Sequence, residues 1–192
     1  GDAAGAVIVA RAPEAAVDST VHSNTSEKPT TGSTLLASYL RAEGKNAGAL
    51  VSTALPVCHP FLDPANIAAD SYSHANGHFL TMDGQEVFRF AIRALTESVE
   101  AAAAAAGMEV SDLDWIVPQQ ANLRILDAAG RRLKVDQEKI VSRIRDLGNT
   151  SSASIPVCLD EMIRDGRLQR GQTVAVTGFG GGLTYGCVIF RY

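Results

Sequence analysis

Three short segments carry residue types that can hold an anionic oxygen. Residues 118–122 (Pro-Gln-Gln-Ala-Asn) lie between a predicted strand and a predicted helix, where ligands commonly meet an open α/β sheet. Residues 148–152 (Gly-Asn-Thr-Ser-Ser) precede another predicted helix, whose N-terminus offers free N–H groups and a positive dipole. Residues 179–182 (Phe-Gly-Gly-Gly) have little side-chain bulk, so a ligand can approach backbone donors of the kind that build oxyanion holes. Together the segments point to one site.

Each segment also has a simpler interpretation. A glycine triplet between strands is more often a tight turn, and an asparagine at the start of a helix is usually only its N-cap. A pair of glutamines at a strand end usually faces solvent. Taken one at a time, these alternatives stay open.

The elements that must position these residues are clearest after residue 82. Asp83 and Glu86 form the pattern of a capping box, and apolar residues then recur at helical spacing through the alanines at 101–106. Gly107 ends this predicted helix. The predicted elements that follow are a strand at 113–118, a helix at 121–133, a short strand at 139–144, a helix ending at Asp165, and strands at 173–177 and 184–190. This alternation predicts a layered α/β domain.

The first eighty residues give weaker signals. Residues 5–10 are nearly all apolar and predict a buried strand. Residues 24–33 have the composition of a loop, residues 34–42 suggest a helix, and residues 48–57 suggest a strand.

Composition excludes several classes of protein. The 192 residues carry a net charge of −4, which gives no overall basic field to recruit nucleic acid or anionic lipid. No apolar run approaches the length needed to cross a bilayer, and no signal-peptide pattern opens the chain. The three cysteines lack CxxC spacing, which argues against a disulfide framework or a zinc site. We therefore expect a cytoplasmic protein with reduced thiols, in which Cys158 and Cys187 are small core residues.

Longer stretches of the sequence resemble one family. Residues 114–125 (Asp-Trp-Ile-Val-Pro-Gln-Gln-Ala-Asn-Leu-Arg-Ile), 148–156 and 178–186 are similar, in order, to signatures of the β-ketoacyl-acyl-carrier-protein synthase III family. Residues 82–89 and 1–6 fit the same pattern. The resemblance covers about residues 1–12 and 80–192 and leaves residues 22–79 unaligned.

The resemblance implies a thiolase-like α/β fold built from two related halves that assembles as a homodimer. It assigns residues 1–80 to the end of the N-terminal half, with an unaligned insertion, and residues 81–192 to the C-terminal half. Enzymes of this family load an acyl group from acyl-CoA onto a cysteine and condense it with malonyl-acyl-carrier protein, without a further cofactor. That cysteine belongs to the N-terminal half, which we expect to be a missing partner of this chain.

Residue by residue, the resemblance places Asn149 at the catalytic asparagine and Gly181 at an oxyanion-hole N–H. The family's catalytic histidine is replaced by Gln119. The four histidines lie outside the matching motif, at positions 22, 59, 74 and 78. An amide can donate a hydrogen bond to an oxyanion but cannot titrate near neutral pH as imidazole does.

A basic surface for the acidic carrier protein is also implied. Arg124, Arg131 and Arg132 share one face of a predicted helix, and Arg89 lies on an earlier one. Arginine suits phosphate and carboxylate groups, although a merely solvated helix face is the simpler alternative. The further binding residues implied by the family motif are Gly84, Gln120, Ala121, Asn122 and Leu123.

Two functions remain open at this stage. The chain is either a portion of a synthase that acts in fatty-acid initiation, or a non-catalytic thiolase-fold partner subunit that docks carrier protein. The replacement at Gln119 is what keeps the second hypothesis open.

Overall fold

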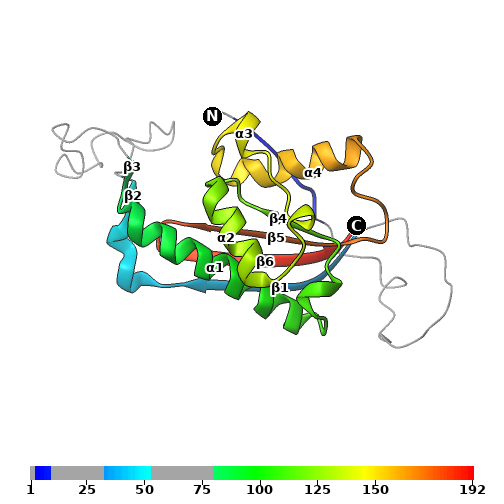
Figure 1. Cartoon of the computed structure of the whole chain (residues 1–192), viewed down its shortest axis with the longest axis horizontal. Helices are drawn as coiled ribbons and strands as arrows, with labels where there is room; N and C mark the ends of the chain where they lie inside the picture. Colours follow the sequence, from blue (N-terminus) through cyan, green and yellow to red (C-terminus); the bar gives the residue numbers. More distant parts are fainter. Residues whose placement is uncertain (1–2, 10–32, 53–79) are drawn as a thin grey trace, which may run out of the picture.

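A central mixed sheet organises the chain (Figure 1). The structure, a computed structural model, describes residues 3–9, 33–52 and 80–192. The strands lie in the order β1 (Thr34–Ala42), β6 (Thr184–Arg191), β5 (Thr173–Gly180) and β4 (Trp115–Pro118). Strands β4 and β5 are parallel, whereas β6 runs antiparallel to both of its neighbours.

Helices cover both faces of this sheet. Helices α1 (Gly84–Ala105) and α2 (Leu123–Leu133) lie on one face, and α4 (Ser154–Arg164) lies on the other (Figure 1). Alternate strand residues therefore enter different clusters. Ile116 and Ala175 pack with α1, whereas Val117 and Val174 pack with α4. Successive residues of a strand point to opposite faces of the sheet, and helices bury both faces here. Most residues of these strands are therefore apolar, which gives continuous apolar runs in the sequence.

Smaller elements connect these layers. They are β2 (Leu50–Ser52), its antiparallel partner β3 (Leu80–Met82), the one-turn helix α3 (Ile144–Leu147), and 3-10 turns at Gly44–Ala49, Val110–Asp112, Gln137–Lys139 and Ser151–Ala153.

The prediction of α1 is confirmed, with half of its predicted capping box. Asp83 caps the helix by accepting hydrogen bonds from the N–H groups of Gln85 and Glu86 at 3.0 and 2.9 Å. The N–H of Asp83 donates to the carbonyl of Ala49 at 2.9 Å, which ties the start of the helix to the preceding 3-10 turn. Buried alanines on the inner face of α1 let it lie close to the sheet and α2; they are Ala91, Ala94, Ala102 and Ala103.

A polar network fastens α1 to β6 and to the end of β1. The Arg93 guanidinium pairs with both carboxylate oxygens of Glu43 at 2.7 and 2.8 Å. The Tyr185 hydroxyl donates to Glu97 at 3.0 Å and to Glu43 at 3.2 Å. Burial, together with these carboxylates, raises the pKa of Tyr185 to about 12. Arg93 is therefore a structural residue of this network.

The prediction of a helix at residues 34–42 is wrong. These residues form β1, which pairs with β6 from Thr34 opposite Arg191 to Ala42 opposite Thr184. Tertiary pairing overrides the local preference, because strand stability comes mainly from packing against neighbours. Strand β1 therefore shares a sheet with elements of the C-terminal half, while the domain boundary near residue 80 stays a prediction.

Three further local predictions need correction. Residues 5–9 form no strand and are exposed, Ile8 at 97%, because no described strand pairs with them. The segment expected as a strand at 139–144 contains the end of a 3-10 turn and makes a single bridge, between Ile116 and Ile140. Of the strand expected at 48–57, β2 supplies Leu50–Ser52, and residues 53–57 lie outside the described residues.

The close pairing of β1 with β6 depends on Gly186. A Cβ at this position would lie 2.6 Å from the carbonyl oxygen of Tyr39 and from a methyl group of Leu40. We predict that Gly186→Ala lowers the free energy of unfolding by about 1–3 kcal/mol, because β1 must shift to accept the methyl group. Urea unfolding followed by circular dichroism measures this loss. Gly48→Ala is the control, since a Cβ there would meet no atom within 4 Å, and an equal loss in both variants would contradict the prediction.

Candidate functional site

The predicted site forms where the parallel strands β4 and β5 end. Pro118 pairs with Thr177, so the carboxyl ends of the two strands lie side by side. The N–H of Gln119 extends this ladder by donating to the carbonyl of Thr177 at 2.8 Å. Its side-chain Oε1 accepts a hydrogen bond from the N–H of Phe179 at 3.3 Å. This contact occupies the amide oxygen and leaves the Nε2 hydrogens as the donors of Gln119.

Gly178 lies directly beside the side chain of Gln119. A Cβ there would lie 3.4 Å from Oε1 of Gln119 and 3.5 Å from its Cβ. Both distances are ordinary van der Waals contacts, so an alanine at this position would lie against the side chain of Gln119 without displacing it.

Gln120 is placed differently from its neighbour. Its side chain is fully buried; Nε2 donates to the carbonyls of Pro118 and Val141 at 2.7 and 3.1 Å, and Oε1 accepts from the N–H of Arg143 at 2.7 Å. The expected contact between Gln120 and a ligand does not fit this geometry, because its amide is used inside the protein. Gln120 instead holds the 141–143 segment against the end of β4.

The turn that carries Asn149 is joined to the same strand end. Asn149 is exposed, and its Oδ1 accepts a hydrogen bond from the N–H of Ser151 at 2.9 Å. The buried hydroxyl of Ser154 donates to the carbonyl of Ser151 at 2.7 Å and accepts from the N–H of Gln120 at 3.0 Å. The turn and the end of β4 are therefore linked directly, as the sequence predicted.

The glycine segment completes the group. Gly181 lies in the exposed turn between β5 and β6, and its carbonyl accepts a hydrogen bond from the Thr184 hydroxyl at 3.0 Å. Phe179, earlier in the same segment, reaches the site because its N–H donates to the side-chain oxygen of Gln119. Hydrogen bonds to Gln119 and Gln120 thus join the three segments, although Gly181 itself has no hydrogen bond to Gln119 or Asn149.

Sequence reasoning missed two residues that build this site. Ser154 looked like an ordinary polar residue at a helix start. Arg143 is a half-buried cation that pairs with Glu161 at 2.7 Å and with Asp146 at 2.9 Å, and its backbone N–H supports Gln120. Neither role has a local signal, because Ser154 and Arg143 bind Gln120 across 34 and 23 positions of the chain, and Arg143 binds Glu161 across 18.

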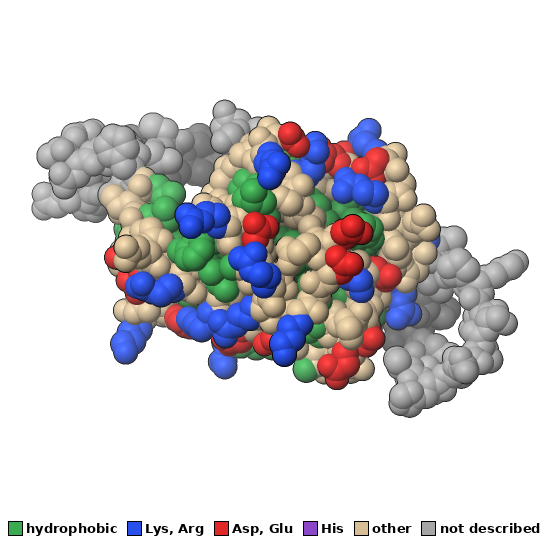
Figure 2. All heavy atoms as spheres, viewed as in Figure 1, with side chains coloured by type: hydrophobic (Ala, Val, Ile, Leu, Met, Phe, Trp, Pro, Cys, Tyr) green, Lys and Arg blue, Asp and Glu red, His purple; other side chains and the backbone are tan. Residues whose placement is uncertain are grey.

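The predicted basic residues lie on adjacent helices. Ala91 and Leu95 of α1 pack against Ile125 and Ala129 of α2, and the arginines occupy exposed positions on these helices: Arg89 on α1, and Arg124, Arg131 and Arg132 on α2. Figure 2 shows Lys and Arg side chains over this part of the molecule, interspersed with apolar and acidic groups.

The remaining predicted binding residues surround the starts of these helices. Asn122 is the N-cap of α2, its Oδ1 accepting from the N–H of Arg124 at 2.9 Å. Ala121 and Leu123 beside it are half-buried, and Gly84 is the exposed first residue of α1. The simple N-cap interpretation thus holds for Asn122, whether or not it also contacts a ligand.

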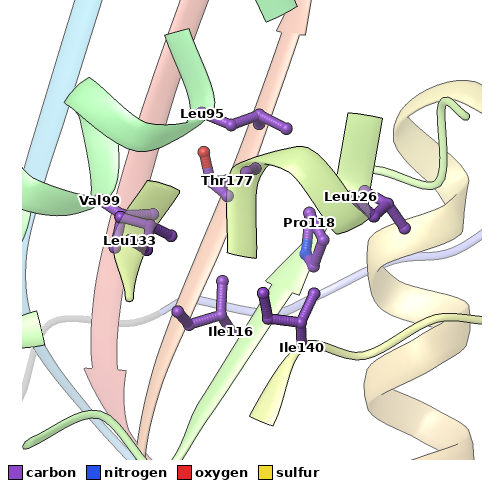
Figure 3. Close-up of a pocket in the computed structure, with 9 residues that line it drawn as sticks. Leu95, Val99, Ile116, Pro118, Leu126, Leu133, Ile140 and Thr177 are labelled. Carbon is purple, nitrogen blue, oxygen red and sulfur yellow. The ribbon is translucent and has the colours of Figure 1, made fainter. Parts of the chain in front are cut away.

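A small apolar cavity lies between α1, α2 and the sheet (Figure 3). Leu95 and Val99 line it from α1, and Leu126 and Leu133 line it from α2. Because the cavity is no larger than a water molecule, it is a packing gap and cannot hold an acyl chain.

In the described part of the chain, no group of three or more His, Cys, Asp or Glu side chains could hold a metal ion, and no helix is long and apolar enough to cross a membrane. The four histidines, at positions 22, 59, 74 and 78, lie outside the described residues, as does Cys58.

The fold is thiolase-like. The solved structure of β-ketoacyl-[acyl carrier protein] synthase III from Thermus thermophilus matches with a TM-score of 0.70 and 34% identity, over 86% of this chain and 48% of that chain. The 3-oxoacyl-[acyl-carrier-protein] synthase III from Aquifex aeolicus matches with a TM-score of 0.69 and 32% identity, over 83% of this chain and 45% of that chain. The predicted fold class is confirmed.

The family follows from sequence comparison. A family model described as 3-oxoacyl-[acyl-carrier-protein (ACP)] synthase III C terminal matches residues 103–192. The β-ketoacyl-[acyl-carrier-protein] synthase III of Sodalis glossinidius is 39% identical over 192 residues, which are 100% of this chain and 50% of that protein. That of Alkalilimnicola ehrlichii is 48% identical over 118 residues, 62% of this chain and 36% of that protein. Residues 103–192 therefore match the C-terminal domain of the 3-oxoacyl-[acyl-carrier-protein] synthase III family.

The chain spans at most about half the length of these relatives. The match to the Sodalis protein runs through the whole chain, so it includes residues 22–79, which the motifs alone left unaligned.

Two cysteines are confirmed as core residues. Cys158 and Cys187 are free and buried, and burial raises their pKa values to about 11 and about 12.

This burial predicts slow alkylation of both cysteines. We predict that iodoacetamide at pH 8 modifies either thiol in the folded chain at less than about one-tenth of its rate in the unfolded chain. The reason is that the buried thiols are largely protonated and the reagent cannot reach them. Peptide mass spectrometry before and after unfolding in urea measures the difference. Rapid labelling of either cysteine before unfolding would contradict this placement.

Proposed function

We propose that this chain supplies the half of a ketoacyl synthase III active site that stabilises the thioester oxygen while malonyl-acyl-carrier protein loses carbon dioxide. The observation that carries this proposal is the orientation of Gln119. Its oxygen is occupied by the N–H of Phe179, and the next residue, Gln120, is hydrogen-bonded through Ser154 to the turn that carries Asn149.

The chemistry requires donors rather than a proton carrier. When the bond to the carboxylate breaks, carbon dioxide leaves and the electron pair passes into the enolate, whose charge rests on the thioester oxygen. Fixed donors aimed at such an oxygen supply a large part of catalysis in many enzymes. The amide hydrogens of Gln119 and Asn149 are donors at every pH, so the proposed step does not depend on the titration of a side chain at position 119.

The condensation step requires a cysteine, which lies in the N-terminal half of enzymes of this kind. The carbanion attacks an acyl thioester, the new carbon–carbon bond forms, and a thiolate leaves. We place that thiolate on the cysteine of the N-terminal half, loaded from acyl-CoA. The relatives are named for this activity, which supports a role in fatty-acid initiation. The reaction needs no cofactor beyond its thioester substrates, and we expect it to take place in a cytoplasmic homodimer.

Carrier protein is the proposed partner of the arginines on α1 and α2. Arg124, Arg131 and Arg132 are exposed and form no ion pair with another described residue, so their charges are available to an acidic surface and to a phosphopantetheine phosphate.

A second candidate function is a non-catalytic partner subunit that docks carrier protein. Gln119 favours it, because the family motif implies a titratable histidine at this position. Both candidates use the same carrier-protein surface, and they differ only in the chemistry at the end of β4.

Substitution of Gln119 separates the two candidates. In protein that combines this chain with a cysteine-bearing N-terminal half, we predict that Gln119→Met slows release of carbon dioxide from malonyl-acyl-carrier protein by about 100-fold or more, because one oxyanion donor is lost. The measurement is release of labelled carbon dioxide together with formation of the ketoacyl product. Gln119→His is the companion variant, expected to keep condensation and to add a pH dependence near neutrality. If the parent and the histidine variant are both inactive, the chain is the non-catalytic partner.

Charge reversal tests the docking surface independently of the chemistry. We predict that Arg124→Glu weakens the binding of acyl-carrier protein by about tenfold at low salt and flattens its dependence on ionic strength, because a complementary charge pair becomes repulsive. Titration calorimetry at two salt concentrations gives both quantities. The control is Arg164→Glu, which reverses an exposed charge on α4, on the other face of the sheet. If Arg124→Glu and the parent bind acyl-carrier protein with equal affinity, Arg124 is not part of the docking surface.

A further inference from the structure

Within the described part of the chain, the hydroxyl of Ser154 is the one side-chain group that joins the turn of Asn149 directly to the strand end of Gln119 by hydrogen bonds. It accepts from the N–H of Gln120 at 3.0 Å and donates to the carbonyl of Ser151 at 2.7 Å. Gln120 follows Gln119 in the chain, and Ser151 is the residue whose N–H binds the side chain of Asn149. This hydroxyl therefore contacts both the residue that follows Gln119 and the residue whose N–H binds the side chain of Asn149.

This arrangement differs from ordinary helix capping. A capping serine accepts from an N–H within the first turn of its own helix. Ser154 is the first residue of α4, yet its hydroxyl accepts from a residue 34 positions earlier. It has no solvent exposure, so water does not compete for its partners, and a hydrogen bond in such surroundings is stronger than one at the surface.

Gln120 makes the link rigid on the strand side. Its buried amide binds Pro118, Val141 and Arg143, so the backbone from residue 118 to residue 120 has little freedom. On the other side, Asn149 and Ser151 form a closed turn. A displacement of the Ser154 hydroxyl must therefore move one of these two units relative to the other.

We propose that Ser154 is a positioning residue that sets the distance between the amides of Gln119 and Asn149, a role that rests on the proposed function of those amides. Misplacement of a catalytic group by about 1 Å can cost roughly 100-fold in rate, so one buried hydroxyl is sufficient to matter. Ser154 itself touches no substrate.

The first test is hydrogen exchange, which does not depend on any activity. In Ser154→Ala we expect the amide of Gln120 and the turn at residues 149–153 to exchange roughly fivefold to tenfold faster than in the parent, because the hydroxyl no longer holds them. Deuterium uptake measured by mass spectrometry locates the change. The matched control is Ser98→Ala, since the hydroxyl of Ser98 is equally buried but binds Leu95 and Thr177 between α1 and β5.

The second test is kinetic, on the same protein combined with a cysteine-bearing half. Ser154→Ala is expected to lower kcat for carbon dioxide release by about tenfold to 100-fold with little change in KM for malonyl-acyl-carrier protein, whereas Ser98→Ala leaves both unchanged. If Ser154→Ala does not fold, Ser154→Cys replaces the hydroxyl by a weaker donor and is expected to give a smaller change in the same direction.

The outcomes separate this inference from the proposed function. Unchanged exchange at both segments, or faster exchange with an unchanged kcat in an active protein, overturns the role of Ser154. A parent protein without any thioester activity overturns the proposed function, and the exchange result then decides alone whether Ser154 holds the two segments together.

Discussion

The parallel pairing of β4 with β5 is the interaction on which the site depends. It sets Pro118 opposite Thr177 and so brings two strand ends to one edge of the sheet. The main-chain hydrogen bond from Gln119 to Thr177 continues that register by one residue beyond the strand. Because the sheet is covered by helices on both faces, the position of this edge is set by the whole core. The site is thus an extension of sheet register rather than a property of flexible loops.

Much of this arrangement could be predicted from sequence, for physical reasons. The helix that follows Asp83 has a side-chain cap and an apolar stripe, both of which are local signals, and its observed bounds agree with the prediction. Strands β5 and β6 are apolar runs separated by glycines, again a local signal. Two of the polar segments, residues 118–122 and 179–182, meet because the carboxyl ends of parallel strands share one edge, whereas the turn at 148–152 reaches that edge through Ser154.

What could not be predicted depends on distant partners. Residues 34–42 suggest a helix locally, and only pairing with β6 makes them a strand. Residues 5–9 have a strong apolar pattern, which predicted a buried strand, but no described strand pairs with them and they are exposed. Gln120 and Gln119 are identical in type and adjacent in sequence, yet one is buried and saturated while the other is partly open to solvent. Burial, not residue type, separates a structural amide from a candidate catalytic one.

That contrast has a consequence for how this protein tolerates change. The hydrogen bonds that hold the strand end in place belong to Gln120, Ser154 and the main chain, and the side chain of Gln119 contributes only its contact with Phe179. Position 119 can therefore exchange one polar side chain for another with little loss of folding, while position 120 cannot. Architecture and reactivity are encoded by neighbouring residues that can evolve separately, so a lineage can gain, lose or regain chemistry here without rebuilding the fold.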